Sequence, residues 1–296
     1  MRLLIPFPAG GSTEFTALTL AGPMGRLLGE PVVVEARAGD AGIVALRELA
    51  HAAGPTLMVG SVNTNSIAPV VFAERIDFDY DAAVRPVARL VEFPSVAVTR
   101  RAVPTETLTA FVAHARRQWG RIRNGTDWIG SYPDIDAARL GRAAGIEVVN
   151  VARDGGAMAL LDALVADEVD LLFLNVRTAS MGIEAGTIRP LAVTGPRRLD
   201  RWPDAPTMAE SGFPGIGITH WHGLFASAAV APDTLRALHQ TAVDVLGAPA
   251  VRDAFRDAGA RLTPSASPEE FAADLRAEMA QWRAVRAEIG LVPHRL

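Results

Sequence analysis

The sequence predicts an α/β protein of two lobes, a clamshell in which each lobe is a mainly parallel sheet flanked by helices. Strand-like apolar runs alternate with segments that are apolar on a helical period, which is typical of parallel sheets with helices on their faces. The alternation falls into three sets along the chain, and 296 residues suffice for two domains of about 100–150 residues. No linker rich in proline, glycine or serine separates the sets, so we expect the two lobes to contact each other.

The first set reads strand, helix, strand, helix, strand, over residues 3–5, 13–28, 31–35, 42–53 and 56–60. The second set has expected helices at 107–118, 134–144 and 157–166, and expected strands at 121–125, 147–151, 169–174 and 188–194. A third set adds a strand at 223–226 and helices at 232–246 and 268–289. We therefore expect lobe 1 to comprise residues 1–98 and 221–296, with its C-terminal helices partly crossing to lobe 2, and lobe 2 to comprise residues 99–220.

The composition narrows the class of protein. With 49% hydrophobic and 21% charged residues, the chain resembles ordinary globular proteins rather than disordered ones. Its net charge of −4 provides no field that attracts DNA or RNA, so we expect no nucleic-acid partner. The absence of cysteine excludes disulfides, thiolate metal sites and cysteine nucleophiles.

The start of the chain bears on its location. No stretch reaches the roughly 18 apolar residues of a membrane span, and no signal peptide precedes the first expected strand, which begins next to Met1. A core strand at the first residues favours a chain whose signal peptide has been removed or omitted over a cytoplasmic protein. We therefore expect a periplasmic protein.

A glycine-rich turn, Pro6-Phe7-Pro8-Ala9-Gly10-Gly11-Ser12, links the first strand to the first helix. Glycines allow the backbone to approach a ligand, and Ser12 or Thr13 can cap the helix. The N–H groups and the positive end of the helix suit an anion such as a carboxylate. A tight turn without a ligand explains the same pattern equally well.

Polar turns also follow other expected strands. Their candidate residues are Ser61 and Asn63, then Thr126, Asp127 and Trp128, then Arg153, Asp154 and Gly155, and finally Asn175. Each turn alone is typical of an ordinary loop. Ligands of open α/β sheets bind at the carboxyl ends of the strands, so together these turns are expected to line one cleft.

Signs of catalysis and of metal binding are weak. The chain has no G-x-S-x-G motif, and no histidine stands beside a serine in a recognisable arrangement. His220 and His222 form the one close histidine pair, expected on one face of a strand, but no carboxylate lies at a ligand-like spacing. We predict no catalytic residues, no metal and no cofactor.

Several strings of the chain, in order, resemble those of the tripartite tricarboxylate transporter substrate-binding proteins, also called the Bug family. The opening Pro6-Phe7-Pro8-Ala9-Gly10-Gly11, with Glu14, is similar to the family's P-F-x-x-G-G-x-x-D. The later strings are Leu28-Gly29-Glu30-Pro31-Val32-Val33-Val34-Glu35, Gly186-Thr187-Ile188-Arg189-Pro190-Leu191, Pro203-Asp204-Ala205-Pro206-Thr207 and Trp221-His222-Gly223-Leu224-Phe225-Ala226. They cover nearly the whole chain.

The resemblance implies a Venus-flytrap protein that closes on a small carboxylate and delivers it to a membrane transporter. It implies that the first glycine turn and a counterpart in lobe 2 hold a carboxylate, largely through backbone N–H groups and ordered water. The ligand-binding residues are then expected to be Phe7, Ala9, Gly10, Gly11, Ser12, Thr13, Ser61, Asn63, Thr126, Asp127, Trp128, Arg153, Asp154, Gly155 and Asn175.

The chain departs from the family pattern around the expected pocket. The family's V-P-Y-x-G reads Val151-Ala152-Arg153-Asp154-Gly155, Glu14 replaces an aspartate, and Leu18 stands near the place of an arginine. The glycine-rich turn of lobe 2 reads Thr126-Asp127-Trp128-Ile129. Arg153 is expected either to meet a ligand carboxylate or to pair with Asp154, Asp127 or Glu14, and Trp128 suggests room for an apolar or aromatic ligand.

We therefore predict an extracytoplasmic solute-binding protein, monomeric and without enzyme activity, that serves the membrane permease subunits of a tripartite transporter. Two alternatives stay open at this point. The first is a sensor that signals to a membrane partner, and the second is a hydrolase of a small acid.

Overall fold

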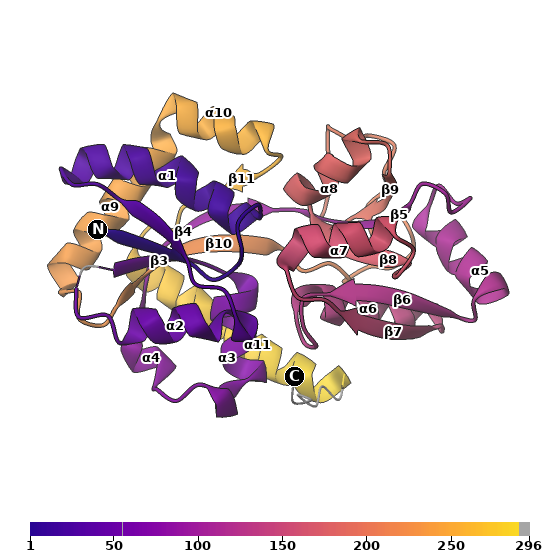
Figure 1. The fold of residues 1–296 in the computed structure, drawn as a ribbon, viewed down its shortest axis with the longest axis horizontal. Helices are drawn as coiled ribbons and strands as arrows, with labels where there is room; N and C mark the ends of the chain where they lie inside the picture. The colour runs from indigo at the N-terminus through magenta and orange to yellow at the C-terminus, as the bar shows by residue number, and fades with distance from the viewer. Residues whose placement is uncertain (55, 290–296) are drawn as a thin grey trace. The chain divides into compact units, whose positions relative to one another are not determined.

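The computed structural model describes residues 1–54 and 56–289, and its chain forms two compact units (Figure 1). Unit 1 comprises Met1–Glu92 and Trp221–Glu288, and unit 2 comprises Phe93–His220. Both units are α/β, which confirms the predicted fold class.

Unit 1 is built on a six-stranded sheet in the order β11-β4-β10-β3-β1-β2. Its strands are β1 (Arg2–Ile5), β2 (Val33–Ala36), β3 (Thr56–Ser61), β4 (Val84–Phe93), β10 (His220–Ser227) and β11 (Arg261–Leu262). β1 pairs in parallel with both β2 and β3, whereas β10 is antiparallel to β3 and β11 is antiparallel to β4. Leu3, Leu4 and Ile5 are buried because both faces of this sheet are covered by helices.

The main helices of unit 1 are α1 (Ser12–Leu28), α2 (Ile43–Ala50), α9 (Pro232–Gly247), α10 (Pro249–Asp257) and α11 (Pro268–Ile289). Shorter helices are η1 (Asp40–Gly42), η2 (Val62–Ile67), α3 (Ala68–Val71), η3 (Ala73–Arg75) and α4 (Tyr80–Ala83). α1 and α2 lie on opposite faces of the sheet (Figure 1). α1 buries Leu20 and Met24 against the strands and ends at Gly29, which adopts the left-handed conformation that favours glycine.

Unit 2 is built on a five-stranded sheet in the order β7-β6-β8-β5-β9. Its strands are β5 (Ser95–Arg100), β6 (Arg121–Thr126), β7 (Glu147–Ala152), β8 (Leu171–Asn175) and β9 (Ile188–Val193). Its helices are α5 (Leu108–Gln118), α6 (Tyr132–Ala144), α7 (Gly156–Val165) and α8 (Val176–Glu184). β6 pairs in parallel with β7 and β8, and β5 is antiparallel to β8 and β9.

The two sheets share one topology. Each sheet has three neighbouring parallel strands, and the first of them along the chain lies between the other two, in the orders β2-β1-β3 and β7-β6-β8. An antiparallel strand lies beside the third, β10 beside β3 and β5 beside β8. This antiparallel strand lies where the chain passes from one unit to the other. β5 follows the first such point and β10 lies at the second. The sheets are therefore mixed, with their parallel strands grouped together.

The first division between the units differs from the expected one. Residues 93–98 were expected in lobe 1, but β5 pairs with β8 and β9 and so belongs to unit 2. β4 and β5 were not anticipated, because β4 contains Pro86 and Pro94 separates the two strands, and proline is disfavoured within sheets. The C-terminal helices were expected to cross partly to lobe 2, but unit 1 includes them as far as Glu288.

Candidate functional site

The polar turns singled out in the sequence follow the carboxyl ends of parallel strands. In unit 1 they follow β1 and β3, and in unit 2 they follow β6, β7 and β8. Because parallel strands end at one edge of their sheet, each unit gathers its own group of candidate residues at one edge.

The turn after β1 is held by an acidic residue of the helix that it precedes. Gly10 has a φ of 93°, and its backbone N–H donates a hydrogen bond of 2.7 Å to the Glu14 carboxylate. Gly11 is the N-cap residue of α1, and no side chain caps this helix end. Phe7 is half-buried and Ala9 is exposed, whereas Ser12 and Thr13 are buried. The N-cap residue of α1 therefore provides no side-chain acceptor for the first N–H groups of the helix, and Glu14 holds the backbone of the preceding turn.

A buried histidine secures the start of α1 and was not anticipated as a site residue. His222 lies on β10 and is fully buried; its Nδ1 is 2.8 Å from Oγ1 of Thr16, and its Nε2 is 3.4 Å from Oγ of Ser12. The sequence showed no histidine beside a serine, but the fold creates such a pair. It lacks the carboxylate that orients the histidine of a catalytic triad, since the other ring nitrogen meets a threonine hydroxyl.

His220 and His222 lie two residues apart on β10, so the expectation that one strand carries both is confirmed. Their rings meet different residues: the ring centroid of His220 lies 5.2 Å from that of Tyr132, whereas His222 contacts Thr16. Burial lowers the pKa of His220 to about 4. Across residues 1–54 and 56–289, no group of three or more histidine, aspartate or glutamate side chains could hold a metal ion.

The segment after β3 forms a buried polar layer in unit 1. Ser61 ends β3, and its Oγ accepts a hydrogen bond of 3.4 Å from the backbone N–H of Thr64. Asn63, in the π-helix η2, is only 2% exposed. Trp282 of α11 donates a hydrogen bond of 2.9 Å from Nε1 to Oγ of Ser66, so this layer is braced by the C-terminal helix.

The turn after β6 repeats the geometry of the turn after β1. Gly130 has a φ of 94°, and its backbone N–H donates to the carboxylate of Asp134, which stands third in α6 as Glu14 stands third in α1. Thr126 Oγ1 donates to the carbonyl of Trp128 at 2.9 Å and lies 2.6 Å from Oγ of Ser131. The Trp128 side chain is 4% exposed, which makes it part of the packed interior of this turn.

Three carboxylates around α6 have raised pKa values. Burial raises the pKa of Asp127 and of Asp134 to about 6 and that of Asp136 to about 7. Backbone N–H groups of Gly217 and Ile218 donate to Asp136, which partly offsets the effect of burial. Desolvation therefore dominates the electrostatics at this end of unit 2.

The turns after β7 and β8 were predicted as ligand positions. Arg153, Asp154 and Gly155 are exposed. Arg153 forms an ion pair with Glu168, so the expectation of an internal partner among Asp154, Asp127 and Glu14 was wrong. Glu168 was missed because it lies in the next turn along the chain, after α7. Asn175 is buried, and its side-chain oxygen accepts a hydrogen bond of 3.1 Å from the backbone N–H of Thr178, which caps α8.

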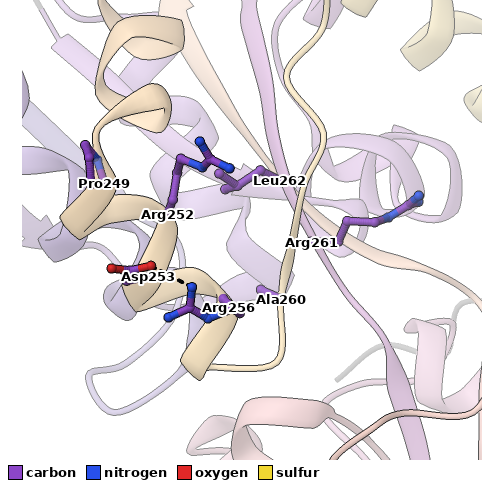
Figure 2. A pocket seen from close by; sticks show the side chains of 7 residues that line it. All are labelled: Pro249, Arg252, Asp253, Arg256, Ala260, Arg261 and Leu262. Atoms are coloured by element: carbon purple, nitrogen blue, oxygen red, sulfur yellow. Dashed lines mark hydrogen bonds and ion pairs between the residues drawn. The ribbon is translucent and has the colours of Figure 1, made fainter.

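A surface pocket of about 480 Å³ lies elsewhere in unit 1, between α10 and β11 (Figure 2). It is lined by Pro249, Arg252, Asp253, Arg256, Ala260, Arg261 and Leu262. Arg256 pairs with Asp253 at 2.7 Å, and Arg261 pairs with Glu92, so most of the positive charge here is already balanced. None of the predicted ligand residues lines this pocket.

The helices of residues 1–54 and 56–289 include none that combines the length and the apolar character needed to span a membrane.

Comparisons with known proteins agree with this architecture. BugT of Bordetella pertussis is 28% identical to this chain over 296 residues, covering 98% of the chain and 89% of BugT. The solved structure of R. palustris Rpa4515 with adipate is 25% identical, with a TM-score of 0.92, and the match covers 99% of this chain and 98% of that one. MatC from Rhodopseudomonas palustris, solved with bound malate, is 27% identical with a TM-score of 0.86 over 96% of this chain and 98% of MatC.

A family model described as the tripartite tricarboxylate transporter family receptor matches residues 17–291. This span contains nearly all of both units, and the resemblance seen in the sequence motifs is thereby confirmed. The chain belongs to the tripartite tricarboxylate transporter receptor family.

Proposed function

We propose that this protein is a periplasmic receptor that binds a small organic carboxylate and delivers it to the membrane permease of a tripartite transporter. A receptor of an uptake system collects its solute outside the cytoplasmic membrane, which supports the periplasmic location. Adipate and malate accompany two similar proteins of known structure, which supports a carboxylate as the ligand.

The observation that carries the proposal is the uncapped N-terminus of α1 after the glycine turn. The first N–H groups of a helix have no acceptor within the helix, and here no side chain of the N-cap residue supplies one. The end of the helix also carries partial positive charge, so a carboxylate is the complementary ligand. Gly11 has no side chain to shield these groups, and Ser12 and Thr13 follow it directly.

The remaining predicted positions are also proposed to be ligand contacts. In unit 1 these are Ser61 and Asn63, and in unit 2 they are the turns that contain Thr126, Asp127 and Trp128, then Arg153, Asp154 and Gly155, then Asn175. We propose that the protein binds without covalent chemistry. The Ser12–His222 contact supports this view, because it is long, at 3.4 Å, and the other ring nitrogen of His222 meets the hydroxyl of Thr16.

The test uses Gly11→Ala. A Cβ at Gly11 meets only the Pro8 carbonyl oxygen, at 4.0 Å, and φ is −85°, so the variant is expected to fold with native stability. The methyl group would stand where a ligand approaches the backbone. In a thermal-shift screen of mono- and dicarboxylates, followed by calorimetry, the native protein is expected to show a ligand that raises its melting temperature, and Gly11→Ala is expected to bind it at least tenfold more weakly.

Arg252→Gln provides the matched control, since Arg252 lines the α10 pocket and makes no ion pair with any residue in 1–54 or 56–289. Native affinity is expected for this variant. Loss of binding in Arg252→Gln, with native binding in Gly11→Ala, would place the anion in the α10 pocket and contradict the proposed site. The absence of stabilisation by any carboxylate would contradict the proposed function.

A further inference from the structure

One carboxylate at the end of β6 has a buried oxygen that receives no hydrogen bond from residues 1–54 and 56–289. Asp127 follows Thr126, the last residue of β6, and begins the turn that leads into α6. Its side chain is half-buried, and its Oδ1 is fully buried without a hydrogen bond from any residue in the described part of the chain. Removing a carboxylate oxygen from water without providing a donor is costly, so this arrangement calls for a group from outside the chain.

The neighbouring acids show what is missing at Asp127. Asp134 accepts hydrogen bonds from the backbone of Gly130 and from the side chain of Asn150, and Asp136 accepts two from backbone N–H groups. No donor of this kind reaches Oδ1 of Asp127 from the described residues, and desolvation alone accounts for the direction of its pKa shift. It also raises the pKa of the neighbouring Tyr132, whose own charged form is disfavoured by burial.

The turn around Asp127 is poorly suited to bind a second anion. The Ser131 N–H already donates to the Trp128 carbonyl at 3.1 Å, and Pro133 has no N–H. Glycine turns after β1 and β6 share one backbone geometry, but only the first keeps an uncapped helix end without proline in its first turn. The second turn instead offers a carboxylate.

Residues 1–54 and 56–289 offer Asp127 no ammonium group. The sequence contains no lysine, the N-terminal ammonium of Met1 pairs with Glu30, and Arg153, at the neighbouring strand end, is paired with Glu168. A ligand ammonium would supply both the missing hydrogen bonds and the missing positive charge, and charge-assisted hydrogen bonds of this kind are the strong ones.

We propose that Asp127 receives a primary ammonium group of the ligand, so that the receptor selects amino-carboxylates over dicarboxylates of the same length. This inference rests on the proposed carboxylate-receptor function. The ammonium group is assigned to Asp127, at the carboxyl end of β6. Specificity thus comes from an acid that repels a second carboxylate as well as attracting a cation.

The experiment compares ligands that differ only in one terminal group. The pairs are succinate with 3-aminopropanoate, glutarate with 4-aminobutanoate, and adipate with 5-aminopentanoate, each titrated by calorimetry at neutral pH. For the native protein, the amino member of at least one pair is expected to bind at least tenfold more tightly than its dicarboxylate. Asp127→Asn is expected to abolish or reverse that preference while melting at the native temperature or above it, because it removes an uncompensated charge.

Asp162→Asn, at an exposed position of α7, is the matched control and is expected to keep the native preference. If dicarboxylates bind as tightly as their amino partners, and Asp127→Asn leaves the ratio unchanged, the assignment of Asp127 is overturned while the carboxylate-receptor function stands. If no member of any pair binds and the wider carboxylate screen also fails, both are overturned.

Discussion

The carboxylate of Glu14 accepts a 2.7 Å hydrogen bond from the backbone N–H of Gly10, and it thereby closes the glycine turn onto the helix that follows. Glu14→Ala removes this acceptor, so we expect the free energy of unfolding to fall by about 1 kcal/mol and the carboxylate affinity to fall with it. Glu14→Gln keeps an acceptor oxygen and is expected to retain most of both quantities. Urea denaturation and calorimetry measure the two effects. Equal losses in the two variants would show that charge, and not the shape of the turn, is what Glu14 supplies.

Replacement of His222 by leucine is expected to destabilise unit 1. The substitution leaves the fully buried Thr16 hydroxyl without its 2.8 Å partner, and an unsatisfied buried polar group costs about 1–3 kcal/mol. Thr16→Val combined with His222→Leu removes both polar groups and is expected to recover part of the loss. A double-mutant cycle by urea denaturation checks this coupling. Additive losses would contradict the pairing.

The stability of the protein is expected to fall as the pH rises from about 6.5 to about 7.5. Burial raises the pKa of Asp136 to about 7, whereas an aspartate in the unfolded chain titrates near 4. The folded state therefore binds more protons than the unfolded state in this window, so raising the pH favours unfolding. His220 acts in the opposite direction, but only below about 6.5, because burial lowers its pKa to about 4 and the unfolded chain takes up the proton first.

Asp136→Asn isolates this contribution. Melting temperatures at several pH values are expected to show a smaller slope between pH 6.5 and 7.5 in the variant, together with a lower overall stability because Gly217 and Ile218 both donate to the native carboxylate. Asp162→Asn, at an exposed site, is expected to keep the native slope. An unchanged slope in Asp136→Asn would show that another group causes the pH dependence.

Arg153 and Glu168 are expected to affect ligand binding in opposite directions. Both side chains are nearly half exposed, and an exposed ion pair contributes about 1 kcal/mol or less to stability. If Arg153 contacts an anionic group of the ligand, Arg153→Gln weakens binding several-fold, whereas Glu168→Gln releases the arginine and strengthens binding. Calorimetry with both variants decides the matter. Native affinity in both Arg153→Gln and Glu168→Gln would show that Arg153 pairs with Glu168 and does not contribute to ligand binding.

The sequence predicted the features that depend on neighbouring residues. The turn of Gly10 and Gly11 could be predicted because glycines between an apolar strand and a helix indicate a close backbone turn. The contact between His222 and Thr16 could not be, because it joins residues 206 positions apart and depends on where β10 enters the sheet. The partner of Arg153 was missed for a related reason, since the choice among nearby carboxylates depends on the path of the chain between β7 and β8.

The place of β10 in its sheet determines the order in which the two units can be completed. β10 lies between β4 and β3, so until residues 220–227 have been synthesised, β4 has no strand that joins it to β3. Unit 2 is continuous from Phe93 to His220 and can therefore complete its sheet first, although unit 1 contains the N-terminus. By strand order alone, the sheet of the unit that contains the N-terminus is therefore the second to become complete as the chain lengthens. The glycine turn after β1 is among the first segments made, but it acquires its support from His222 only when three quarters of the chain exist.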